Sequence, residues 1–311
     1  MRRAAVLLAS ILVLGACGDS DRRAPVPPAA APTSTVAATS TSTTLPVATL
    51  LAAGDIAACN STGDEATAAL LDARPNAMIA TLGDNVYESG TATEFANCYD
   101  PSWGRHKDRT RPAIGNHEYG VFRAGGYYGA FGAAAGEAPL GWYSYDLGVW
   151  HVIVLNSNCE VVGCATGGSQ DRFIRDDLAA HPARCTVAIW HHPRWSSGTV
   201  HGPTVALQSL YTALFELGVD ILLTGHEHNY ERFAPLDPAG AVDPVRGIRQ
   251  FVVGTGGRSH YPLGPPAPGS EVRNDNTFGV LALTLRPGSY QWQFVPEAGK
   301  SFTDAGSDNC H

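Results

Sequence analysis

Six short apolar segments, each ending beside a Gly, Asp, Asn or His, constrain the fold of this chain more than any other feature. Within each segment the apolar residues are continuous and do not alternate with polar ones. Each segment therefore predicts a β-strand that is covered on both faces. The six segments are residues 49–53, 77–82, 149–155, 186–190, 221–223 and 250–253.

Helical patterns separate several of these strands, and strands that alternate with helices indicate βαβ units and an α/β fold. Near the C-terminus, residues 278–294 alternate apolar and polar side chains around Pro287-Gly288, which predicts a hairpin. Three helices are each expected to follow an N-cap residue and to stop at Pro or Gly. Their caps are Asp64, Ser169 and Thr204, and their stops are Pro75, Pro182 and Gly218.

The N-terminal residues predict export rather than a folded domain. Residues 1–16 have two arginines, an apolar stretch too short to span a bilayer, and small residues before Cys17. The run Leu14 to Cys17 resembles a bacterial lipobox, which implies cleavage before Cys17, lipidation of its thiol, and anchoring to the cell membrane on the extracellular or periplasmic side. The alternative is an ordinary secretory signal in which Cys17 is incidental.

The Ala-, Pro-, Ser- and Thr-rich stretch that follows is expected to be a disordered tether. It has almost no large apolar side chains, so it cannot bury enough surface to offset the entropy of ordering. We therefore divide the chain into a signal peptide (1–16), a lipidated cysteine with its tether (17–47) and one domain (48–311).

Six cysteines follow Cys17, and an even number in an exported protein predicts disulfides rather than a thiolate metal site. Proximity in the chain favours a bond between Cys159 and Cys164. For the other four we expect Cys59 with Cys98 and Cys185 with Cys310, although spacing alone leaves all fifteen pairings open.

The charge of the chain excludes one class of partner. The formal net charge is −8, and beyond the first residues the basic side chains cluster only in the mixed stretch 105–111. A nucleic-acid-binding face needs a concentrated basic surface, so we expect no nucleic acid partner.

Potential metal ligands stand just beyond the ends of the predicted strands. In α/β sheets, binding sites lie outside the carboxyl ends of the strands. Carboxylate, amide and imidazole together suit zinc, iron and manganese. Taken singly, each of these residues could be a turn or cap residue, but together they predict a metal site. They are Asp55, Asp84, Asn116, His191, His226 and His228.

Five blocks that contain these residues resemble, in order and spacing, those of the calcineurin-like metallophosphoesterases. The resemblance implies a four-layer α/β fold, in which two mixed β-sheets pack as a sandwich flanked by α-helices. The blocks are Gly54-Asp55, Gly83-Asp84-Asn85-Val86-Tyr87, Gly115-Asn116-His117-Glu118, Trp190-His191-His192-Pro193 and Gly225-His226-Glu227-His228.

One departure from the common pattern points to a subgroup. Most of the superfamily has a metal-binding histidine where this chain has Ala57, which has no donor atom. The chain instead has Tyr87 three residues after Asp84, a pairing that resembles the purple acid phosphatases. A phenolate is a hard anionic donor and favours Fe(III).

This resemblance implies two metal ions. Fe(III) at the first site would be held by Asp55, Tyr87 and His228. Fe(II), Zn or Mn at the second site would be held by Asn116, His191 and His226, and Asp84 would bridge the two ions.

The same resemblance implies catalytic roles for two histidines outside the ligand set. His117 would contact the phosphate or leaving-group oxygen as an acid or hydrogen-bond donor. His201 would lie near the substrate. Of the adjacent His191 and His192, the ligand is expected to be His191, because the family's block places its ligand two residues before Pro193.

The expected function is an extracytoplasmic phosphomonoesterase that hydrolyses small phosphate esters by attack of a metal-bound hydroxide. A phosphodiesterase or nucleotidase would use the same metals with a different cleft. A catalytically inactive cell-surface binding protein is the third alternative, and the complete set of ligand residues argues against it. The natural substrate and the oligomeric state are not encoded in any motif that we recognise.

Overall fold

A computed structural model of the chain describes residues 47–311. The signal peptide, the lipidated Cys17 and almost all of the tether lie outside the described residues. None of the helices within residues 47–311 combines the length and hydropathy that crossing a bilayer requires.

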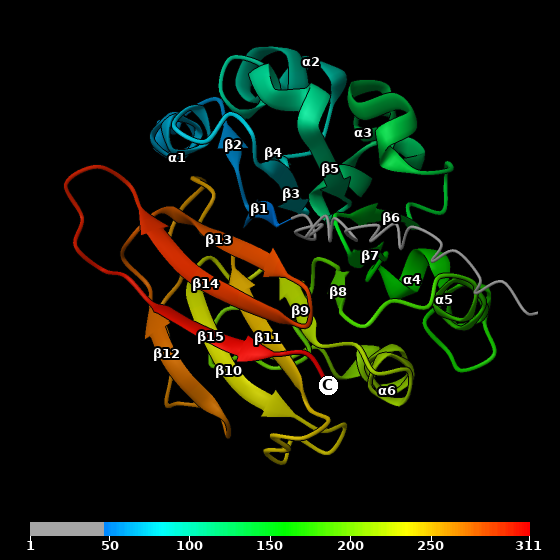
Figure 1. Cartoon of the computed structure of the whole chain (residues 1–311). Coiled ribbons are helices and arrows are strands. Elements are labelled where there is room, and N and C mark those ends of the chain that lie inside the picture. The colour runs from blue at the N-terminus through cyan, green and yellow to red at the C-terminus, as the bar shows by residue number, and fades with distance from the viewer. Residues whose placement is uncertain (1–46) are drawn as a thin grey trace, which may run out of the picture. The chain divides into compact units, whose positions relative to one another are not determined.

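Two mixed β-sheets form the centre of the fold, as the sequence predicts (Figure 1). In the first sheet β1 pairs parallel with β3 and antiparallel with β13. In the second, β8 pairs parallel with β7 and β9, while β6 and β7 are antiparallel. A third sheet contains only β2 (Ala57–Ala58) and β4 (Val86–Tyr87).

The six-stranded sheet has the order β15-β14-β13-β1-β3-β5. Its strands are β1 (Ala48–Ala53), β3 (Met78–Leu82), β5 (Thr110–Ala113), β13 (Gly279–Arg286), β14 (Ser289–Pro296) and β15 (Ala305–Asn309). The seven-stranded sheet has the order β12-β10-β11-β9-β8-β7-β6. Its strands are β6 (Tyr143–Leu147), β7 (Trp150–Val154), β8 (Thr186–Ile189), β9 (Ile221–Thr224), β10 (Tyr230–Leu236), β11 (Ile248–Val253) and β12 (Ser270–Asn274).

The apolar strands of the second sheet are buried on both faces. In β8, Val187 and Ile189 belong to the core between the sheets. The side chains of Ala188 and Trp190 point the other way, into the core beneath α5 and α6. Because both faces are covered, the strand contains no alternating polar positions. All six predicted strands are confirmed with small shifts in their ends.

Helices lie outside the sheets, with α5 and α6 beside the β7–β8 part of the second sheet and α1 beside the first (Figure 1). The α-helices are α1 (Gly63–Asp72), α2 (Ala92–Glu94), α3 (Gly125–Phe131), α4 (Cys159–Val162), α5 (Ser169–Ala180) and α6 (Gln208–Glu216). Short segments of other helix types are η1 (Phe95–Tyr99), η2 (Trp103–Arg109), η3 (His117–Gly120), η4 (Phe122–Ala124), η5 (Gly132–Ala135) and η6 (Val205–Leu207).

The three predicted helices exist, but two of the three predicted caps are wrong. Asp64 lies inside the first turn of α1, whose N-cap is Thr62. Ser169 is the first residue of α5 rather than its cap. Thr204 is the N-cap of the 3-10 turn η6, which continues directly into α6 at Gln208. The predicted hairpin is confirmed, because β13 and β14 pair antiparallel across Pro287-Gly288.

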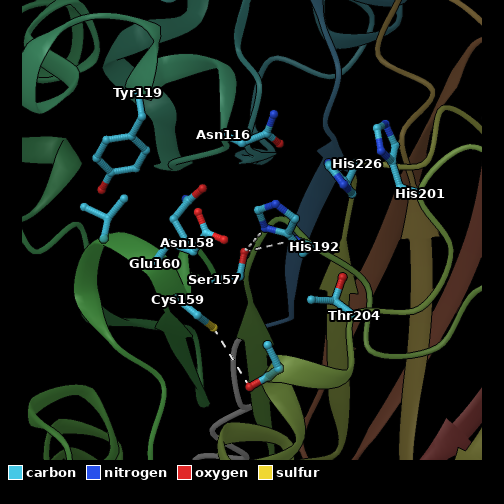
Figure 2. A pocket seen from close by; sticks show the side chains of 12 residues that line it. Asn116, Tyr119, Ser157, Asn158, Cys159, Glu160, His192, His201, Thr204 and His226 are labelled. Carbon is cyan, nitrogen blue, oxygen red and sulfur yellow. Dashed lines mark hydrogen bonds between the residues drawn. The ribbon is translucent and has the colours of Figure 1, made fainter.

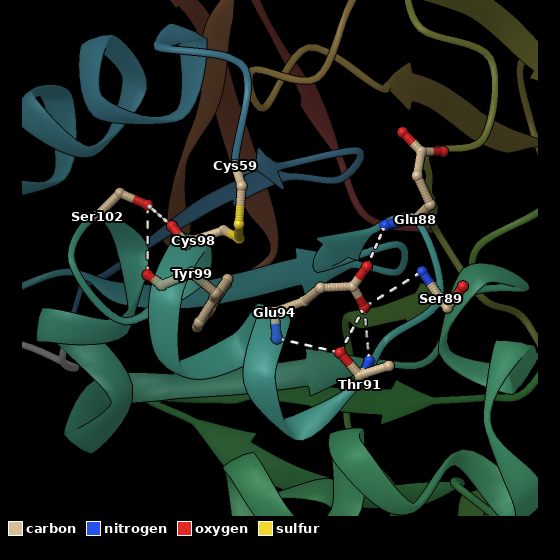
Figure 3. Close-up of a disulfide and its surroundings, with 8 residues drawn as sticks. All are labelled: Cys59, Glu88, Ser89, Thr91, Glu94, Cys98, Tyr99 and Ser102. Atoms are coloured by element: carbon tan, nitrogen blue, oxygen red, sulfur yellow. Dashed lines mark hydrogen bonds between the residues drawn. A yellow bond between two sulfur atoms is a disulfide. The ribbon is translucent and has the colours of Figure 1, made fainter.

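Three disulfides join the six cysteines in the predicted pairs. They are Cys59–Cys98, Cys159–Cys164 and Cys185–Cys310. The first fastens η1 to the loop after β2, beside the capping box of Thr91 and Glu94 at the start of α2 (Figure 3). Three disulfides are typical of a domain that folds in an oxidising, extracytoplasmic compartment.

Candidate metal centre

The predicted site residues meet at one edge of the two sheets. Asp55, Asp84 and Asn116 follow β1, β3 and β5 of the first sheet. Two further residues, His191 and His226, follow β8 and β9 of the second sheet, and His228 comes shortly after. The carboxyl ends of parallel strands lie together, so residues from distant parts of the chain converge there.

The backbone at this edge is unusual at three of these positions. Asp55, Asp84 and His226 have φ angles of 61°, 48° and 70°. Residues other than glycine adopt this left-handed region at a cost in free energy, and such residues concentrate at functional sites. Gly115 is required for a steric reason, because a Cβ at this position would collide with the Asp84 carboxylate.

Tyr87 lies at the centre of the first donor group. Its hydroxyl oxygen is 2.9 Å from Asp55 Oδ1 and 3.1 Å from Asp84 Oδ2. The same oxygen is 3.1 Å from His228 Nε2. Ala57 sits on β2, the strand that pairs with the one carrying Tyr87. The tyrosine therefore brings an oxygen donor to a group in which Ala57 offers none.

His191 lies at the centre of the second donor group. Its Nε2 is 3.1 Å from Asn116 Oδ1 and 3.2 Å from His226 Nδ1. The same nitrogen is 3.2 Å from Asp84 Oδ2. That carboxylate oxygen is thus close to the central residue of both groups, which is the position a bridging ligand needs.

The rings of His191 and His228 are held in orientation by neighbouring residues on the side away from the donor groups. Leu82 O accepts a hydrogen bond of 2.7 Å from His191 Nδ1, so Nδ1 carries a proton and Nε2 is the nitrogen that faces the site. His228 Nδ1 is 2.7 Å from Ser259 Oγ, and the ring of Tyr261 stacks on that of His228 with centroids 3.8 Å apart. Such partners fix the ring orientation of metal-binding histidines.

Three further histidines surround the two groups. His117 Nε2 lies 3.9 Å from Asp84 Oδ2, and its Nδ1 donates to the carbonyl oxygen of Glu88 at 2.6 Å. The ring of His201 stacks on that of His226 with centroids 4.1 Å apart. His192 Nδ1 lies 2.7 Å from Ser157 Oγ, and its ring is 4.2 Å from that of His226 between centroids.

The site concentrates buried acidic groups, which cations would stabilise. Asp55 and Asp84 are buried, and within residues 47–311 no Lys or Arg forms an ion pair with either. Burial would raise the pKa of Asp84, but the neighbouring His191 charge holds it below its usual value. Burial and the two carboxylates raise the pKa of Tyr87. Buried acidic groups without fixed cationic partners are stable when they coordinate metal ions, so this donor set fits two cations.

Two buried glutamates that the sequence analysis did not single out build the loops of the site. Glu118 accepts backbone hydrogen bonds from Gly115 (2.7 Å), Asp84 (3.1 Å) and Asn85 (2.7 Å). Glu227 accepts one from His201 (2.7 Å) and thereby fixes the loop that carries this histidine. Both glutamates follow a predicted site histidine directly, and that adjacency is the signal that could have identified them.

A pocket of about 530 Å³ opens beside the second donor group (Figure 2). Most of its lining residues have polar side chains without a fixed charge. The lining residues are Asn116, Tyr119, Ser157, Asn158, Cys159, Glu160, Val161, His192, His201, Thr204, Ala206 and His226.

Comparison with known proteins agrees with this geometry. The family model of calcineurin-like phosphoesterases matches residues 48–230, more than half of the chain. The chain belongs to the calcineurin-like phosphoesterase family. This phosphoesterase is 26% identical over 221 residues to Purple acid phosphatase 15 of Arabidopsis thaliana, covering 58% of the chain. It is 30% identical over 201 residues to Acid phosphatase A of Cryphonectria parasitica, covering 56% of the chain.

The phosphoesterase matches only 40% of the length of each of these two relatives. Among solved structures it is similar in fold to purple acid phosphatase PPD1 from yellow lupin seeds. The TM-score is 0.65 at 19% identity, with 85% of this chain and 54% of that one covered. The Plasmodium protein GAP50 has a TM-score of 0.66 at 15% identity, covering 85% of this chain and 89% of that one. At these identities the likeness concerns the fold alone.

Proposed function

We propose that this phosphoesterase is a binuclear metal phosphomonoesterase similar to the purple acid phosphatases. The observation that carries the proposal is the position of Tyr87, whose hydroxyl lies within 3.1 Å of donor atoms of Asp55, Asp84 and His228. The two curated relatives described above are acid phosphatases by name, which supports the same subgroup.

We assign Asp55, Tyr87 and His228 to a first ion, Fe(III), because a phenolate is a hard anionic donor. Asn116, His191 and His226 are assigned to a second, divalent ion, which could be Fe(II), Zn or Mn. Asp84 would hold both ions. When bound, two such cations lower the pKa of a water molecule and neutralise the charge of a phosphate.

His117 is proposed as the acid that protonates the leaving group. The Glu88 carbonyl can only accept a hydrogen bond, so Nδ1 keeps its proton and Nε2 is the nitrogen that faces the site. A protonated Nε2 would donate to the leaving-group oxygen. His201 is proposed to contact the substrate from the other side, because its ring stacks on that of His226 at the pocket.

The first test compares a monoester with a diester. We expect the purified protein to hydrolyse 4-nitrophenyl phosphate, to contain two metal ions per chain, and to be purple or pink because of an iron–tyrosinate bond. A preference of about tenfold or more in kcat/KM for bis(4-nitrophenyl) phosphate would favour a phosphodiesterase instead. A metal-free protein without esterase activity would favour a binding protein.

Export and lipid anchoring at Cys17 are a separate proposal. It is supported by the lipobox-like run before Cys17 and by the three disulfides of the domain. The full chain should incorporate labelled fatty acid when expressed in bacteria, and Cys17→Ser should abolish the incorporation. Equal labelling of the two proteins would refute the assignment.

A further inference from the structure

We propose that the pocket beside the second donor group selects phosphomonoesters whose alcohol part carries no negative charge, and that Glu160 is the residue that selects them. This inference rests on the proposed phosphomonoesterase function and names its substrate class. Hydrolysis breaks the P–O bond to the alcohol and forms a P–O bond to the oxygen of water, and the alcohol oxygen takes up a proton.

The position of the pocket assigns it to the alcohol part. Asn116 and His226 belong both to its lining and to the second donor group. A phosphate held at the donor groups would therefore leave the rest of the ester in this pocket. In Figure 2 the pocket extends from His226 and His201 past His192 to Asn158 and Glu160 on the opposite side.

The fixed charge of the pocket is negative. Glu160 is its only carboxylate, and no Lys or Arg is among the lining residues that the structure describes. Glu160 is exposed and takes part in no ion pair within residues 47–311, so nothing neutralises its charge there. A second carboxylate or phosphate on the alcohol would be repelled, most strongly where solvent is partly excluded.

One basic side chain near the metal centre lies outside the pocket. Arg258 packs over the ring of Tyr87, 5.1 Å from its centroid, and is paired with Glu88. It is therefore beside the first donor group, and it does not line the pocket. An additional anionic group on the alcohol would find no Lys or Arg partner among the lining residues of the pocket.

Uncharged hydroxyl groups would find partners in the pocket. Tyr119 Oη accepts a hydrogen bond of 2.8 Å from Asn156 Nδ2, which leaves its own proton free to donate. The Thr204 hydroxyl lines the pocket and has no hydrogen-bond partner among the described residues. These groups suit a polyol or an amino alcohol.

The wall that carries Glu160 is held in place. Glu160 lies on the one-turn helix α4, and the disulfide between Cys159 and Cys164 closes the segment that contains it. Asn158 O accepts hydrogen bonds from the backbone amides of Val161 (2.9 Å) and Val162 (3.1 Å). These constraints act on the backbone, so they keep the residue that carries the charge beside the pocket.

The test uses two substrates of nearly the same shape. Glycerol 3-phosphate carries an uncharged hydroxymethyl group where 3-phosphoglycerate carries a carboxylate. We expect kcat/KM to be about tenfold or more higher for glycerol 3-phosphate. The substitution Glu160→Gln should reduce this ratio several-fold, mainly by raising kcat/KM for 3-phosphoglycerate. Glu160→Lys should reduce it further.

The matched control is Asp176→Asn, which removes one negative charge from an exposed position of α5 outside the pocket. It should leave the ratio unchanged. Equal rates for the two esters, a preference for 3-phosphoglycerate, or an identical change in Asp176→Asn would overturn the inference. In each of these cases hydrolysis of 4-nitrophenyl phosphate would still support the phosphomonoesterase. Loss of all monoester hydrolysis in the native protein would overturn both.

Discussion

The hydroxyl of Tyr87 lies between two buried carboxylates, an environment that opposes its ionisation. In the protein alone, burial and the charges of Asp55 and Asp84 raise its pKa. A trivalent cation at the same place would reverse this effect, because it stabilises the phenolate and the carboxylates together. The site therefore couples ionisation of the tyrosine to occupation by a highly charged ion.

Replacing Tyr87 by Phe tests that coupling. The variant keeps the ring, which packs 4.4 Å from that of His117 between centroids, but it loses the donor oxygen. We expect loss of visible colour and of iron from the first site, with the second ion retained and phosphatase activity strongly reduced. Metal analysis and the absorption spectrum measure the outcome. An unchanged spectrum would show that Tyr87 does not bind the iron.

His117→Ala separates catalysis from metal binding. The side chain approaches Asp84 Oδ2 to 3.9 Å, whereas Tyr87 lies 3.1 Å and His191 3.2 Å from the same oxygen. We expect both metals to remain and kcat to fall by about 10²-fold or more for a lost acid. Loss of metal from this variant would mean that His117 is a ligand.

At the scale of elements, Glu118 joins the turn after β3 to the turn after β5. It is buried, and it accepts backbone hydrogen bonds on both turns. Burial and the nearby Asp84 charge raise the pKa of Glu118 to about 7. One side chain thus fixes the spacing between the residues that follow two neighbouring strands.

Glu118→Gln should destabilise the protein. The amide has a single acceptor oxygen, so at least one buried backbone amide would lose its partner, at a cost of about 1–3 kcal/mol. We expect a lower melting temperature and weaker metal binding. Glu137→Gln, at an exposed position, is the control and should change neither. Equal melting curves for the native protein and Glu118→Gln would contradict this role.

The sequence predicted strands better than helix ends, for a physical reason. A strand covered on both faces must be apolar throughout, so Val187 to Ile189 are recognisable from composition alone. The start of α1 is set instead by tertiary contacts. Ser61 Oγ donates to Gly257 O at 2.8 Å, and a Cβ at Gly63 would collide with the backbone of Gly257. No local pattern encodes a contact across nearly two hundred residues.

In the metal centre, too, some residues were recognisable from the local sequence and others were not. The residues of the two donor groups were predictable because each lies in a recognisable block shortly after an apolar strand. Ser259, Tyr261 and Glu160 were not, because they reach the site from segments without a motif. Their contribution follows from the way distant loops pack together, which requires the folded structure.

At the scale of the whole molecule, the disulfides differ in the length of chain they close. The sequence separation is 125 residues for Cys185–Cys310 and 5 for Cys159–Cys164. If disulfides act mainly by lowering the entropy of the unfolded chain, Cys185–Cys310 contributes about 5 kcal/mol to the free energy of unfolding and Cys159–Cys164 contributes about 2 kcal/mol.

Pairwise replacement by serine tests this difference. The free energy of unfolding should fall by more than twice as much for Cys185→Ser with Cys310→Ser as for Cys159→Ser with Cys164→Ser. Denaturant titration of the two double variants, with retained secondary structure as the control, measures it. A larger loss for the short closure would contradict the entropic explanation.

The Cys185–Cys310 bond and the metal centre lie at opposite ends of the same strand. Cys185 immediately precedes β8, and Cys310 follows β15 of the other sheet. His191 lies just beyond the opposite end of β8, where donors from both sheets meet. The sandwich is thus cross-linked covalently at one end and, when loaded, by coordination at the other. A reductant and a chelator should therefore loosen opposite ends of the same strand, and amide hydrogen exchange along β8 would reveal which end had opened.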